Sequence, residues 1–154
     1  MTIETTHQAL PLSCAETAKL VRAALKRAFP GQQFSVRSSV HSVYATIYVK
    51  WTDGPRWHAV DTTTRAYEGS GYGADFVYCA RSVSDFEAKR AEAESYIREH
   101  CVLDADGRWY RNRQVADIAR NMARDYLPGE DWDTTFQRYF YPSDYNADGT
   151  PRLA

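Results

Sequence analysis

Cysteine is scarce in this sequence, and long apolar runs are absent. The three cysteines, Cys14, Cys79 and Cys101, are odd in number and widely separated, which does not fit a disulfide framework. No stretch approaches the roughly 20 apolar residues of a membrane-spanning helix, and the first residues lack the pattern of a secretory signal. We therefore expect a cytoplasmic protein with reduced thiols and no membrane partner.

Recognisable metal and nucleotide motifs are also missing. His7, His41, His58 and His100 are scattered along the chain and do not form a zinc-binding pattern with the cysteines. Three glycines fall within residues 69–73, but the spacing is not that of a P-loop and the lysine of that motif does not follow. The sequence therefore predicts no metal site, no cofactor and no catalytic set.

The sequence also lacks an excess of either charge, with 19 basic and 20 acidic residues. The distribution is nevertheless uneven. Residues 13–60 carry seven Lys or Arg and two Asp or Glu, whereas residues 83–154 carry ten and fourteen. Either the two parts attract each other, or the first part presents a basic surface to a partner.

Helix signals are clear at two places. Ser13 and Glu16 have the spacing of a capping box, in which each side chain satisfies a backbone donor of the first turn, and Pro30-Gly31 ends that helix. Ser84 and Glu87 repeat the same spacing, which predicts another helix that extends to about Cys101.

Strand patterns lie between these helices. Residues 34–37 and 43–51 alternate between apolar and polar positions, and the loop 38–42 would join them as an antiparallel hairpin. Val43, Ala45, Ile47 and Val49 are expected to face the core. A helix over about 55–67 and a strand over 75–82 follow.

The fold class predicted is α+β, with a small, mainly antiparallel three-stranded sheet in the order helix, strand, strand, helix, strand, helix. Residues 1–12 are expected to form a flexible arm and residues 13–101 the α+β core. Residues 102–154 are expected to form a hairpin around 104–107, a helix over 115–126 and a short aromatic helix, all packed on the core as a C-terminal helical extension.

Four separated blocks, residues 16–22, 28–31, 34–39 and 49–55, suggest a family. Together they resemble the twenty-ninth type of large polyvalent protein-associated domain, over about residues 14–85. The resemblance implies a setting in proteins of phages, plasmids and other mobile elements. It implies no reaction and carries over no catalytic residue.

Candidate binding residues lie on the predicted hairpin and on the last helix. Tyr44, Tyr48, Arg37 and Lys50 share the hairpin face opposite the helices, and tyrosines flanked by cations are used to bind single-stranded nucleic acid. That face could instead be covered, merely solvated or used for protein binding. The further candidates are Trp132 and Tyr139, which would dock the extension on the sheet or form an exposed contact patch, including one for self-association.

The function expected from these observations is that of a non-enzymatic accessory protein of a mobile element. It would bind a host protein or protein–nucleic-acid complex, for example to inhibit a CRISPR or restriction system. Two alternatives stay open, a single-stranded nucleic-acid-binding module and an enzyme of unknown reaction. The enzyme alternative would use polar residues near the sheet edge: Arg37, Ser38, Ser39, His41, Asp53, Tyr72 and Arg81.

Overall fold

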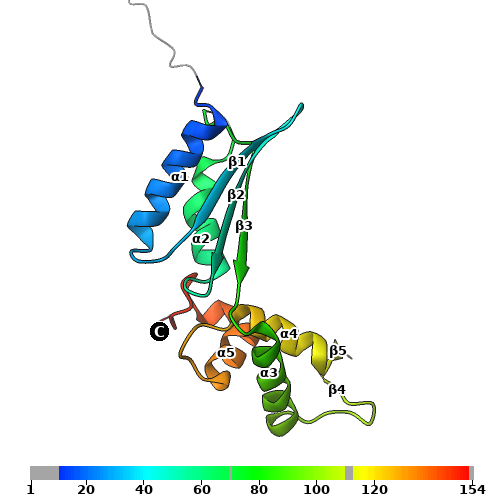
Figure 1. The fold of residues 1–154 in the computed structure, drawn as a ribbon. Helices are drawn as coiled ribbons and strands as arrows, with labels where there is room; N and C mark the ends of the chain where they lie inside the picture. Colours follow the sequence, from blue (N-terminus) through cyan, green and yellow to red (C-terminus); the bar gives the residue numbers. More distant parts are fainter. Residues whose placement is uncertain (1–10, 70, 110–112, 153–154) are drawn as a thin grey trace, which may run out of the picture.

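Helices cover one face of a small sheet, and further helices continue the chain beyond one end of it (Figure 1). The computed structural model describes residues 11–69, 71–109 and 113–152. The helices are α1 (Cys14–Ala28), α2 (Trp57–Thr64), α3 (Phe86–His100), α4 (Val115–Asp125) and α5 (Trp132–Phe140), with the 3-10 turns η1 (Arg65–Tyr67) and η2 (Pro142–Asp144). The strands are β1 (Ser35–Val40), β2 (Ala45–Thr52), β3 (Phe76–Ser82), β4 (Arg108–Trp109) and β5 (Arg113–Gln114). The predicted α+β class is confirmed, although the expected order left out the 3-10 turns and the two short strands. The predicted arm lies almost wholly outside the described residues.

Helix α1 begins at the predicted capping box. The Ser13 hydroxyl accepts a hydrogen bond from the Glu16 N–H at 3.2 Å, and the Glu16 carboxylate accepts one from the Ser13 N–H at 2.8 Å. These two bonds satisfy donors that the first turn leaves without intrahelical partners. The helix ends before Gly31, whose φ of +82° is readily accessible to glycine.

The three-stranded sheet has the order β1-β2-β3 and is mixed. β1 and β2 form the predicted antiparallel hairpin, but β3 runs parallel to β2. The prediction of a mainly antiparallel sheet was therefore wrong. The physical reason is the connection through α2 and η1, which returns the chain so that β3 starts at the same end of the sheet as β2.

The first apolar core lies between this sheet and the two helices α1 and α2. Ile47 and Val49 of β2 are fully buried there, together with Val21 of α1 and Val60 of α2. The expectation that Val43 would join them was wrong, since this residue lies in the hairpin loop before β2 and is 85% exposed. The alternation predicted the inward face correctly only within the strand itself.

Helix α3 starts without the predicted capping box. Its N-cap residue is Asp85, with φ +52° and no side-chain capping bond. The Ser84 hydroxyl instead donates to Asp53 Oδ2 at 2.6 Å, and the Ser84 N–H donates to Asp53 Oδ1 at 2.9 Å. Asp53, in the turn after β2, therefore holds Ser84 in the chain that follows β3. This long-range contact replaces the predicted capping bond between Ser84 and the start of α3.

A second apolar core lies among α3, α4 and α5. Ala93 and Ile97 of α3 are fully buried against Ile118 and Met122 of α4. The first core is formed by residues before position 85, which make up the sheet unit, and the second by residues after it, which make up the helical unit. The turn at 104–107 is present, with a Gly107 N–H to Asp104 O bond of 3.0 Å. The short strand β4 after that turn pairs with β5, and Tyr110 of the expected hairpin lies outside the described residues.

Arginine side chains connect the sheet unit to this helical unit. Arg81 of β3 donates to the backbone oxygens of Arg124 and Tyr126, at 2.8 and 2.7 Å. Arg56, just before α2, donates to the carboxylate of Asp125 at the end of α4. The helical unit is therefore held at one end of the sheet and not across its face (Figure 1).

Candidate functional site

The outer face of the sheet, opposite α1 and α2, is the candidate site. The strand registers fix which side chains it presents. They are Ser35, Arg37 and Ser39 of β1, Thr46, Tyr48, Lys50 and Thr52 of β2, and Phe76, Tyr78, Ala80 and Ser82 of β3. Among these residues there are two cations and no carboxylate, so the face attracts anions.

Aromatic rings form a continuous row on this face. Tyr48 and Tyr78 are stacked with their ring centroids 6.0 Å apart, and Phe76 follows at 6.1 Å from Tyr78. Tyr44 lies 6.3 Å from Phe76, and His41 lies 4.6 Å from Tyr44 at the hairpin tip. Tyr78 is 56% exposed, Phe76 47% and Tyr48 37%, so these side chains are partly accessible to a partner.

The two cations lie at the Tyr48 end of the row. An open pocket of about 380 Å³ is lined there by Ser35, Arg37, Tyr48 and Lys50. Arg37 is directly opposite Tyr48 in the strand pairing, and Ser35 is opposite Lys50. The pocket therefore combines one ring, two positive charges and a hydroxyl, which suits a planar group linked to an anion.

Thr46 lies in the central strand, near the hairpin end of the face, between Ser39 and Phe76 of the neighbouring strands. It is fully buried, and its Oγ1 has no hydrogen-bond partner among the described residues. A buried hydroxyl without a partner costs free energy of folding. The row of rings is thus dense enough to exclude water from the strand beneath it.

The structure brings together four of the six residues predicted from the sequence. Arg37, Tyr48 and Lys50 surround one pocket, and Tyr44 belongs to the same aromatic row. Sequence reasoning missed Phe76 and Tyr78. Their alternation within one strand was visible, but only the parallel register with β2 places Tyr78 beside Tyr48 and Phe76 beside Thr46.

Trp132 and Tyr139 lie elsewhere, in the helical unit. The Trp132 indole donates to Glu92 at 3.1 Å, and its ring is 4.9 Å from that of Tyr126. The Tyr139 hydroxyl is 3.4 Å from both Arg113 and Asn121. These aromatic side chains pack against the second core and do not reach the sheet face.

The polar residues considered for catalysis are divided between distant places. Ser39 Oγ and His41 Nε2 are 3.1 Å apart at the hairpin end, whereas Asp53 is at the other end of β2 and binds Ser84. The guanidinium of Arg81 is occupied by backbone oxygens. The structure therefore does not unite this set in one cavity.

Neither a metal-binding cluster nor a membrane-spanning helix is found among the described residues. Within them, no group of three or more His, Cys, Asp or Glu side chains is placed to hold a metal ion. In the same part of the chain, no helix has the length and apolarity needed to cross a membrane.

Comparison with known proteins identifies the class of this chain. The family model of large polyvalent protein associated domain 29 matches residues 12–102, which is more than half of the chain. The chain belongs to this family, and the match associates it with mobile genetic elements. The matched range extends through α3, further than the resemblance seen in the sequence. Neither the curated proteins nor the solved structures gave a match.

Proposed function

We propose that this protein of a mobile element binds single-stranded nucleic acid on the outer face of its sheet. The observation that carries the proposal is the exposed row of rings, spaced about 6 Å apart, that ends at Arg37 and Lys50. Bases stack on such rings whatever their sequence, and cations follow the phosphates. A cytoplasmic location is part of the proposal, because all three cysteines are free thiols.

The experiment is fluorescence anisotropy with a labelled oligothymidylate at low salt. Tyr48→Ala and Tyr78→Ala should each weaken binding by about 1–3 kcal/mol, the usual range for one base–ring stack. Tyr141→Ala is the matched control, since Tyr141 is 54% exposed but lies in the helical unit. Equal losses in Tyr78→Ala and Tyr141→Ala, or no binding by the wild type, would reject the proposal.

The cations provide a second readout. Single-stranded binding weakens with salt by a slope of about −0.7 per phosphate contact. Arg37→Gln combined with Lys50→Gln should therefore reduce the slope of log K against log salt by about 1.4. An unchanged slope would show that these two residues do not contact phosphates.

A host protein is the alternative partner for this face, with inhibition of a CRISPR or restriction complex as the corresponding role. Exposed tyrosines and an arginine are also enriched in protein interfaces. Binding to a host complex that persists in high salt and is not competed by oligothymidylate would favour this alternative.

A further inference from the structure

Strand β1 is one edge of the sheet, and its outward backbone groups can be identified from the hairpin. The His41 N–H donates to Tyr44 O at 2.8 Å, so this pair is hydrogen-bonded across the hairpin. Because hydrogen-bonded and non-hydrogen-bonded pairs alternate along an antiparallel ladder, Val36, Ser38 and Val40 point their N–H and C=O groups away from β2. They form an edge to which another strand can be added.

The opposite edge, on β3, is closed by side chains. The Val77 N–H donates to Glu68 Oε1 at 2.8 Å, and Cys79 O accepts a bond of 2.8 Å from the Trp57 indole. On β1 the corresponding cap made by described residues is limited to Val36 O, which accepts a bond of 2.7 Å from Arg22 of α1. Among the described residues the two edges therefore differ in their capacity to accept a strand.

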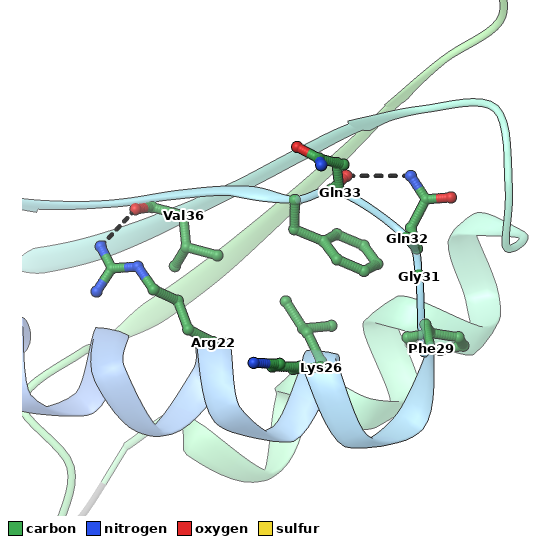
Figure 2. Close-up of a pocket in the computed structure, with 9 residues that line it drawn as sticks. Arg22, Lys26, Phe29, Gly31, Gln32, Gln33 and Val36 are labelled. Carbon is green, nitrogen blue, oxygen red and sulfur yellow. Dashed lines mark hydrogen bonds between the residues drawn. The ribbon is translucent and has the colours of Figure 1, made fainter.

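A groove lies between α1 and the chain that leads into β1, and it reaches the open edge at Val36 (Figure 2). Its volume is about 380 Å³. The apolar side chains that line it are Leu25, Phe29, Phe34 and Val36. Figure 2 shows Arg22 reaching from α1 to Val36 and Lys26 beside it, so the groove has an apolar floor and a positively charged rim.

Charge decides which occupant fits. Arg22 and Lys26 line the groove, Arg37 lies on the other side of β1, and no acidic side chain is found among the described lining residues. A second copy of this chain paired through β1 would bring like charges together. Acidic side chains on the outer face of an added strand would instead lie beside Arg37 and pair with it, while Arg22 and Lys26 remain at the rim of the groove.

We propose that the β1 edge and this groove bind an extended segment of a partner protein, in which apolar residues alternate with acidic ones. The segment adds as a fourth strand, so its backbone pairs with Ser38, Val40 and the Val36 N–H, while Val36 O keeps its bond from Arg22. Its apolar side chains fill the groove against Leu25 and Phe29. Its acidic side chains project to the other face, beside Arg37.

Hydrogen exchange by NMR on the whole chain tests the pairing directly. The probe is an acetylated and amidated hexapeptide of alternating valine and glutamate. Binding should slow amide exchange at Ser38 and Val40 by at least about tenfold at saturation, the effect of about 1.4 kcal/mol of added protection. Amides of Arg37 and Ser39 already pair with β2, so they should change little. A hexapeptide with lysine in place of glutamate should produce no protection, and equal protection by both peptides would overturn the proposal.

Variants separate the edge from the rest of the fold. Ser38→Pro removes an outward N–H without breaking the β1–β2 ladder, and should abolish peptide binding while an unchanged spectrum elsewhere confirms folding. Ser38→Ala keeps that N–H and should bind as the wild type does. Peptide binding by Ser38→Pro at wild-type affinity would overturn the proposal. A dimer of the wild type that forms without peptide and is lost in Ser38→Pro would also overturn it, because the edge would then bind a second copy of this chain.

Discussion

Arg56 donates two hydrogen bonds to Asp125, at 3.0 Å from Nε to Oδ1 and 3.2 Å from Nη2 to Oδ2. The same carboxylate accepts a third bond of 3.0 Å from Arg138 Nε. Arg56 belongs to the sheet unit, and the fully buried Arg138 belongs to α5. The Asp125 carboxylate therefore bonds two buried guanidinium groups across the junction, and Arg138 is paired with Glu130 as well.

Removal of that carboxylate should destabilise the protein strongly. Asp125→Ala leaves Arg56 without its charged partner and removes one from Arg138, and breaking a buried pair from one side costs about 3–5 kcal/mol. Urea unfolding measures the change. Asp61→Ala is the control, because its partner Arg65 is 68% exposed in the side chain and a surface pair contributes less than about 1 kcal/mol. Similar losses in both variants would contradict the role of the junction.

Glu130 makes stability depend on pH. Burial alone would raise its pKa, but hydrogen bonds from Arg138, Thr135 and the Leu127 N–H outweigh burial and hold the pKa below its ordinary value of 4.5. A depressed pKa in the folded state adds stability that is complete above the unfolded pKa and is lost as pH falls through the folded one.

The difference in unfolding free energy between the wild type and Glu130→Gln should therefore be largest near neutral pH. It should shrink from about pH 5 downward, as the wild-type carboxylate is protonated. Urea titrations at several pH values measure this difference. Glu99→Gln, on the exposed side of α3, is the control. A difference that stays constant down to pH 3 would contradict the prediction.

Thr46 offers a stabilising substitution. Its Oγ1 is buried without a partner in the described part of the chain, and a hydroxyl in that state costs about 1–3 kcal/mol. Thr46→Val removes the hydroxyl, keeps the shape and should raise the free energy of unfolding by about 1 kcal/mol. Thr46→Ser keeps the hydroxyl, loses a methyl group and should be destabilising. A Val variant less stable than the wild type would show that the hydroxyl is satisfied in solution.

The capping box of α1 should be measurable. Ser13→Ala removes the acceptor for the Glu16 N–H and should cost about 1 kcal/mol in urea unfolding. Ser13→Thr retains a capping hydroxyl and should cost only a few tenths. Equal losses in the two variants would mean that the hydroxyl bond contributes nothing.

How much of the fold was predictable depended on the range of the interactions. The α1 cap and the antiparallel pairing of β1 with β2 are encoded within a few residues, and both were predicted correctly. The loop was not, because β1 continues through Val40 and the connection falls at 41–44 instead of 38–42. The direction of β3 depends on how the α2 connection returns, and the start of α3 depends on Asp53, some 31 positions before Ser84. Local spacing contains neither kind of information.

The candidate site shows the same limit. Tyr44 and Tyr48 could be found from alternation in one strand, whereas Phe76 and Tyr78 required the register between strands. The aromatic spacing predicted the last helix correctly. It could not show whether Trp132 lies on an exposed patch or packs against a neighbouring helix, as it does in the structure.

The cap on β3 has a consequence for assembly. When a strand adds to β1, the opposite edge of the sheet is β3, where Glu68 and Trp57 already bond backbone groups that point outward. Pairing of β1 in one copy with β3 in the next would have to displace both bonds, so we expect this sheet to resist edge-to-edge growth into a filament.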